Sequence, residues 1–250
     1  SIRTIISVNY TVEEFGYFTF SFTIANAVML LLDSFNTILF PKTIDLMSSD
    51  DNKKKADALE KMRVGYILTS HMLVYLAMIC FPILVWFIPK YMPALSSMNM
   101  IALAVLMNTN SYGYSNMLIA QNKEHKAGFI SAVSLIVNII LGLGLAKILN
   151  VEYSYITIAI LVAYMISSFL MAYEGDTILR REKSLSYTLK HFFPIRMFIP
   201  YMIALIISCT QIEYLIFIPL LVFIMLNYKD LQFLKNIALK LIKEPEVIDV

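Results

Sequence analysis

The sequence predicts an all-α membrane protein, a polytopic bundle of transmembrane helices. Hydrophobic residues make up 59% of its 250 positions and charged residues only 15%, whereas soluble domains usually carry about 25% charged residues. The apolar residues also gather in long runs that short charged stretches separate. These runs are too long and too continuous for the strands of a closed β-barrel, which is the other structure that can span a bilayer.

Seven apolar runs approach the length of about 20 residues that a helix needs to cross a hydrocarbon core roughly 30 Å thick. We therefore expect about seven full transmembrane helices, preceded in residues 1–10 by the end of an eighth. Pro41 is expected to end the first of the seven, and the last two are short enough to form a tight hairpin. The seven runs are 15–40, 64–88, 96–120, 127–148, 155–173, 192–209 and 214–228.

Lysine and arginine predict the orientation of the bundle. Alternate loops, namely 42–63, 121–126, 176–196 and the tail after 228, carry six, two, five and four of the 20 lysine and arginine residues. The opposite loops carry only Lys90 and Lys147, and Arg3 lies within a helix. The positive-inside rule therefore predicts that the basic loops face the cytoplasm.

Two basic segments are candidates for helices on the inner membrane surface. In the loop 41–63, Ala56, Leu59 and Met62 recur at helical spacing, which predicts a short amphipathic helix with a solvated charged loop as the alternative. The tail after residue 228 has the same pattern and would be attracted to anionic headgroups. We divide the chain into a helix bundle at 1–175, an additional transmembrane hairpin at 176–228 and a cytoplasmic amphipathic tail at 229–250.

Ionisable side chains at bilayer depth are costly, so Arg3, Asp33 and His71 are functional candidates. We expect Asp33 and His71 at equal depth on consecutive helices, as a pair that responds to protons or cations. The alternative is a hydrogen bond that only joins the two helices. Arg3 lies about 12 Å deep at 1.5 Å per residue and is expected to bind an anion in a hydrated cavity. Its alternative is an arginine that snorkels to the interface.

Polar side chains form a stripe on each of four predicted helices. Small and polar residues also mediate helix packing in membranes, which is the alternative explanation for any single stripe. Four stripes on neighbouring helices favour a common hydrated cavity. The stripes are Thr19, Asn26, Asp33 and Thr37; Asn108, Ser111, Tyr112 and Ser115; Ser131, Ser134, Asn138 and Gly142; and Thr157, Tyr164 and Ser168.

The motifs of soluble enzymes are missing from the sequence. It has no phosphate loop, dinucleotide-binding turn, metal-ligand cluster or nucleophile elbow. Cys80 and Cys209 both fall in apolar runs and are expected to be buried thiols. We therefore expect no catalytic residue, metal or cofactor, and membrane lipids rather than nucleic acid as surroundings.

Three segments carry a family resemblance. They are "SIRTIISVNYTVEEFGYFTFSFTIAN", "FNTILFPKTIDLMSSDD" and "NMLIAQNKEHKAGFISAVSLIVNIILGLGLAKIL". By order and spacing they resemble the C-terminal half of polysaccharide flippases of the O-antigen type, within the multidrug/oligosaccharidyl-lipid/polysaccharide exporter superfamily. The resemblance covers roughly residues 1–173. The family often has an acidic residue beside the arginine of its seventh helix, and Ile2 stands there in this chain.

The resemblance implies the second lobe of a two-lobe transporter, from the end of helix seven to helix twelve, with two further helices. Its partners would be a missing N-terminal lobe of the same chain and a lipid-linked oligosaccharide. Such a protein moves undecaprenyl-pyrophosphate-linked sugar units across the bacterial cytoplasmic membrane by alternating access. Arg3 would then attract the pyrophosphate, and Asp33 and His71 would couple transport to an ion gradient. The residues expected to bind the sugar are Asn26, Asn108 and Asn138.

Three other functions compete with this interpretation. A multidrug or cation antiporter of the same superfamily would need an acidic, aromatic-lined cavity. A membrane-embedded glycosyltransferase or polymerase would need a substantial outer loop with arginines, and no outer loop exceeds about seven residues. A receptor or scaffold would need a binding ectodomain, for which the sequence has no candidate.

Overall fold

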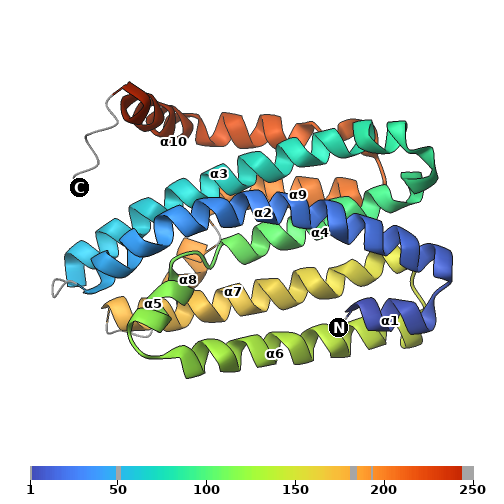
Figure 1. Cartoon of the computed structure of the whole chain (residues 1–250), viewed down its shortest axis with the longest axis horizontal. Helices are drawn as coiled ribbons and strands as arrows, with labels where there is room; N and C mark the ends of the chain where they lie inside the picture. Colours follow the sequence, from blue (N-terminus) through green and yellow to red (C-terminus); the bar gives the residue numbers. More distant parts are fainter. Residues whose placement is uncertain (1, 49–51, 181–184, 193, 244–250) are drawn as a thin grey trace.

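A computed structural model of the chain describes residues 2–48, 52–180, 185–192 and 194–243, and these residues form an all-α bundle without a strand. The helices lie side by side along the longest axis of the molecule (Figure 1). They are α1 (Ile2–Asn9), α2 (Val12–Ser48), α3 (Asn52–Phe87), α4 (Leu95–Thr109), α5 (Tyr114–Ala120), α6 (Glu124–Leu143), α7 (Thr157–Arg180), α8 (Leu185–Phe192), α9 (Ile195–Thr210) and α10 (Ile218–Lys243).

The bundle is that of a multi-pass membrane protein. Within the described ranges, six helical stretches are long and apolar enough to cross a membrane. The sixth of the seven predicted spans corresponds to α9, which has only 16 residues and is a shorter apolar helix than the other six. Proline explains its length, because Pro194 separates α9 from the short α8.

The junctions between helices alternate between the two ends of the bundle. The α2–α3, α5–α6 and α7–α8 junctions and the end of α10 lie at one end (Figure 1). The α1–α2, α3–α4, α6–α7 and α9–α10 junctions lie at the other. The first set contains the four basic segments of the sequence, so we call that end of the bundle the basic end.

The prediction of a loop at 41–63 is wrong. Helix α2 continues through Pro41 to Ser48, and α3 begins at Asn52, so the expected short helix is the first part of α3. A proline inside a helix costs about 3 kcal/mol because it removes one backbone hydrogen bond. Helix α2 nevertheless continues past this residue, and α2 and α3 run side by side as an antiparallel pair (Figure 1).

The prediction of a single helix at 96–120 is also wrong, because this segment forms two helices, α4 and α5. The chain turns at residues 110–113, where Gly113 has φ = 83°, a conformation that glycine adopts without steric cost. Hydroxyl groups satisfy carbonyls at the end of α4: Thr109 donates to Leu106 at 2.7 Å and Ser111 donates to Asn108 at 2.8 Å.

Helix α4 is the centre of the bundle and packs against α2, α3, α7 and α9. Every residue of α4 is buried except Asn108. Close packing elsewhere depends on glycine: a Cβ atom at Gly142 would lie 2.7 Å from the Ile2 side chain and 2.9 Å from that of Ile5. The absence of a side chain at Gly142 therefore lets α1 approach α6.

The C-terminal segment is helical, as expected for the tail, but it is continuous with the last span. Helix α10 runs to Lys243 with a kink at Asn227, whose φ is −116° and ψ 18°. The Asn227 side chain donates to the Phe223 carbonyl at 3.0 Å and to the Arg196 carbonyl at 3.2 Å. Side chains after Gln232 lie outside the described residues, so the apolar face of the tail stays a prediction.

Candidate functional site

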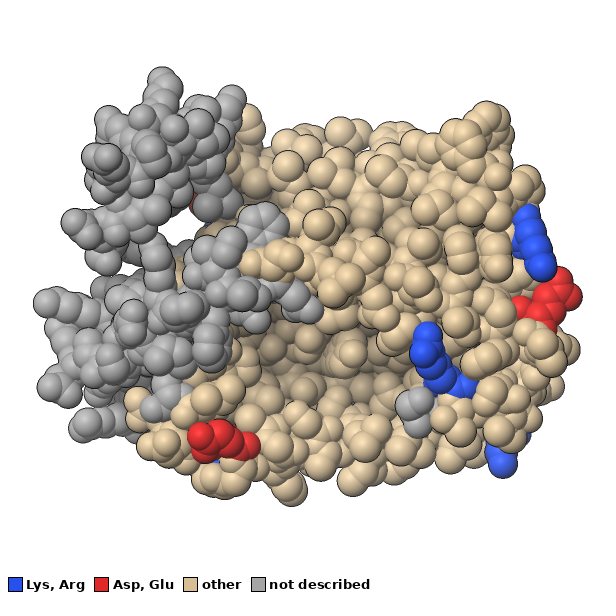
Figure 2. All heavy atoms as spheres, in the orientation of Figure 1, with Lys and Arg blue, Asp and Glu red and all other residues tan. Residues whose placement is uncertain are grey.

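A cavity of about 400 Å³ lies where α1, α2, α4, α6 and α7 meet. The face of the molecule shown in Figure 2 is hollowed between α2 and α6, beside α1. Polar residues from four of the five helices line this cavity together with apolar ones. The lining residues are Ile2, Arg3, Phe18, Phe22, Asn108, Ser131, Ser134, Leu135, Asn138, Ile160, Tyr164 and Ser167. We call it the Arg3 cavity.

Arg3 carries the positive charge of this cavity. The neighbouring side chains of Ile2, Ile5 and Ile6 are buried in the core, so α1 is anchored and its arginine is held in place. The guanidinium carbon lies 4.7 Å from the centroid of the Phe22 ring, a cation–π distance. In the described part of the chain no carboxylate pairs with Arg3, so its N–H donors are available to an anion.

Asn108 on α4 and Asn138 on α6 also line the cavity and bring two side-chain amides to it. The Asn108 carbonyl accepts hydrogen bonds from Ser111 at 2.8 Å and from Ser168 at 3.4 Å. Neither side-chain amide has a hydrogen-bond partner among the described residues. Each amide therefore offers two donors and an acceptor to a ligand.

Hydroxyl groups complete the polar lining. Ser134 on α6 donates to the Ala163 carbonyl on α7 at 3.0 Å and ties the two helices together. Ser131, Tyr164 and Ser167 also line the cavity, and no hydroxyl bond of theirs is found in the described structure. Their hydroxyl groups can therefore both donate to and accept from a ligand.

Several residues of the predicted polar stripes have structural roles instead, as Ser111 and Gly142 do. Ser168 is buried and bonds the Asn108 carbonyl, and Thr157 is buried and donates to the Ser154 carbonyl. Sequence reasoning missed Ser167. Helical spacing could have identified it, because Ile160, Tyr164 and Ser167 are spaced to lie on one face of α7.

Asn26, the remaining predicted sugar ligand, is not among the residues that line the Arg3 cavity. It lies one helical turn beyond Phe22 on α2 and is half-buried. Helix α2 instead presents the aromatic rings of Phe18 and Phe22 to the cavity.

The predicted Asp33–His71 pair is only partly described, because the Asp33 side chain lies outside the described residues. The Tyr66 hydroxyl donates to the Leu32 carbonyl at 3.5 Å, so α2 and α3 are in contact near these residues, and the Asp33–His71 contact stays a prediction. His71 is five residues further along α3, which is about 7.5 Å at 1.5 Å per residue. Equal depth was expected because Pro41 was assumed to end α2.

His71 has other partners. Its ring is buried, and its Nδ1 donates to the Ile67 carbonyl at 2.9 Å when that nitrogen carries the proton. The ring stacks on Phe223 of α10 at a centroid distance of 5.6 Å and meets Tyr75 edge-on at 5.8 Å. His71 therefore belongs to an aromatic contact between α3 and α10, away from the Arg3 cavity.

A buried polar network at the basic end was not predicted, because Arg63 was counted as a loop cation. The Arg63 guanidinium donates to the Asn110 carbonyl at 3.2 and 3.3 Å and to the Tyr114 hydroxyl at 3.1 Å. Tyr114 donates to Asp176 at 3.0 Å, and Thr188 donates to the same carboxylate at 2.9 Å. The network joins α3, α5, α7 and α8 and holds the broken end of α4.

The side chains that line the Arg3 cavity indicate which kind of ligand would fit it. One cation, two amides and several hydroxyl groups suit a ligand that has both an anionic group and many hydroxyl groups. The residues that the structure describes include no group of histidine, cysteine or carboxylate side chains that could hold a metal ion. No protein-family model, curated protein or solved structure matches the chain.

Proposed function

We propose that this membrane protein is a flippase that moves a lipid-linked oligosaccharide across the bacterial cytoplasmic membrane. Its substrate would be a sugar unit carried on undecaprenyl pyrophosphate, and the chain would be the second lobe of a two-lobe transporter. The observation that carries the proposal is the Arg3 cavity. In it, an arginine lies beside two amides and several hydroxyl groups, and among the described residues the arginine has no carboxylate partner and most of these groups have no hydrogen-bond partner.

The chemistry of the lining matches the parts of such a substrate. A guanidinium is a planar fork of donors that fits phosphate oxygens and stays charged at any depth. Asn108 and Asn138 offer donors and acceptors to sugar hydroxyls, as do Tyr164 and the serines. The polyprenyl tail would stay in the bilayer, next to the Phe18 and Phe22 rings.

The proposed cycle is alternating access around a cavity within the membrane. Arg3 would attract the pyrophosphate from the basic end of the bundle, which the positive-inside rule assigns to the cytoplasm. The lobe would then rock against its partner lobe and open the cavity to the other leaflet. No bond in the substrate is made or broken.

The charge of the cavity disfavours the runner-up, a multidrug antiporter for cationic compounds. The described lining contains Arg3 and no acidic side chain. A cationic drug would be repelled by a guanidinium that cannot lose its proton. An anionic substrate is the better match.

Replacement of Arg3 in the full-length protein tests the proposal. Arg3→Ala should abolish export of the lipid-linked sugar while membrane insertion and abundance stay near normal, because the side chain is exposed and has no ion pair with a described residue. Arg3→Lys should restore export in part, since the charge returns without the bidentate geometry. Lys147→Ala removes an exposed cation that does not line the cavity and should export normally. Normal export by Arg3→Ala would refute the anion-binding role.

A further inference from the structure

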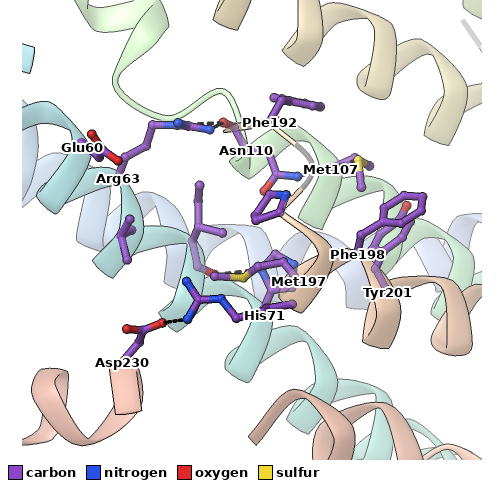
Figure 3. A pocket seen from close by; sticks show the side chains of 14 residues that line it. Glu60, Arg63, His71, Met107, Asn110, Phe192, Met197, Phe198, Tyr201 and Asp230 are labelled. Atoms are coloured by element: carbon purple, nitrogen blue, oxygen red, sulfur yellow. Dashed lines mark hydrogen bonds and ion pairs between the residues drawn. The ribbon is translucent and has the colours of Figure 1, made fainter. Parts of the chain in front are cut away.

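A second cavity, of about 280 Å³, lies on the other side of α4, between α3, α9 and α10. Its two ends differ in chemistry. Glu60, Arg63, Arg196 and Asp230 surround the end nearer the basic loops, whereas the rest of the lining is mainly apolar or aromatic. Figure 3 shows Glu60, Arg63 and Asp230 on one side of the cavity and the Phe198 and Tyr201 rings on the other.

The length of this cavity matches one leaflet of a bilayer. Glu60 and His71 both line it and lie eleven residues apart on α3, which is about 16 Å at 1.5 Å per residue. Half of a hydrocarbon core roughly 30 Å thick is nearly the same length. The apolar part of the lining includes Ile67, Met107 and Met197. Such walls offer water few polar partners but offer a hydrocarbon chain many contacts.

The charged end of the cavity has side chains that can bind an anionic group and side chains that can bind a cationic group. The N–H groups of Arg63 donate to the Asn110 carbonyl and the Tyr114 hydroxyl. Arg63 therefore has a structural role. Arg196 pairs with Asp230 at 2.6 Å through one nitrogen, and its side chain is 59% exposed. Among the described residues its other N–H donors have no partner, so they are available to a phosphate. Asp230 and the exposed Glu60 carboxylate can accept hydrogen bonds from an ammonium group.

We propose that this cavity binds one phospholipid that has a primary-amine headgroup, with an acyl chain between α3, α4 and α9. The phosphate lies on Arg196, the ammonium group lies on Asp230, and Glu60 is a second carboxylate at the same end of the cavity. A trimethylated amine has no N–H to donate to these carboxylates, and an anionic headgroup brings no positive charge to them. The bound lipid stabilises the packing of the α9–α10 hairpin against α3. This site does not depend on the proposed transport activity.

The test compares the purified full chain in nanodiscs whose phospholipids differ only in their headgroup. Phosphatidylethanolamine should raise the unfolding temperature and remain bound in native mass spectrometry, whereas phosphatidylcholine and phosphatidylglycerol with the same chains should do neither. Glycerophosphoethanolamine, which has the headgroup without chains, should not stabilise the protein. Equal stabilisation by all three lipids, or equal binding of phosphatidylglycerol, would overturn the assignment.

Two variants locate the site. Arg196→Ala should weaken retention of phosphatidylethanolamine roughly tenfold, because a charge-assisted contact to the phosphate is lost. Lys126→Ala is the matched control, because it breaks the partly exposed ion pair between Lys126 and Glu174, which does not line this cavity. Met197→Trp fills the apolar part without changing a charge and should displace the lipid. Retention of the lipid by both Arg196→Ala and Met197→Trp would refute the site, even if the protein exports its substrate normally.

Discussion

Gly175 in α7 allows the Tyr114 ring to pack directly against the helix backbone. A Cβ atom at this position would overlap Tyr114 Cδ1 and lie 2.9 and 3.0 Å from two other ring carbons. The ring has no room to retreat, because its hydroxyl is bonded to both Arg63 and Asp176. We therefore predict that Gly175→Ala destabilises the protein.

The size of the effect follows from three contributions. Replacing glycine by alanine within a helix stabilises it by about 1 kcal/mol, while overpacking a filled site costs about 1–3 kcal/mol. Displacement of the ring also weakens the hydrogen bond from Tyr114 to Asp176, and bonds to charged groups contribute about 1.5–3 kcal/mol. The free energy of unfolding should therefore fall by about 2–4 kcal/mol.

Gly128 in α6 provides a matched control. A Cβ atom there would meet nothing within 4 Å, so Gly128→Ala should leave stability unchanged or raise it by up to about 1 kcal/mol. Unfolding in mixed micelles, followed by titration with a denaturing detergent, measures both variants. A double-mutant cycle with Tyr114→Leu should show strong coupling to Gly175→Ala and none to Gly128→Ala. Equal effects of the two alanines would refute the packing argument.

Two further predictions concern orientation and substrate binding. In intact cells and in a background without Cys80 and Cys209, an impermeant reagent should label a cysteine at Met92 and spare one at Lys183; the reverse pattern would invert the bundle. Asn138→Leu should reduce export of the lipid-linked sugar about tenfold without lowering abundance, because a hydrogen-bonding group in the cavity is lost. Ile136→Ala, at a position 55% exposed on the same helix, should export normally, and equal losses from both variants would contradict the cavity's role.

The sequence already predicted the bundle and much of the Arg3 cavity. Arg3, Asn108, Asn138 and Tyr164 were chosen as polar residues within apolar runs, and the structure brings all four to one cavity. Helical periodicity made this possible, because it assigns residues to a face. It does not decide which faces meet, so Ser168 was expected in the cavity although it is buried behind it and bonds the Asn108 carbonyl.

Local sequence therefore determined which segments are helical and embedded. Each segment by itself has the apolar length and the internal backbone hydrogen bonds that make its transfer into lipid favourable. Tertiary structure alone decided where helices end and which charges are buried. Helix α2 continues past Pro41, and the turn at Gly113 divides a run that was expected to form one helix. Arg63 belongs to a basic segment by sequence, yet it is 8% exposed because a carbonyl and a hydroxyl from distant positions satisfy its guanidinium. The free energy of a buried cation depends on such partners, and only the folded chain brings them together.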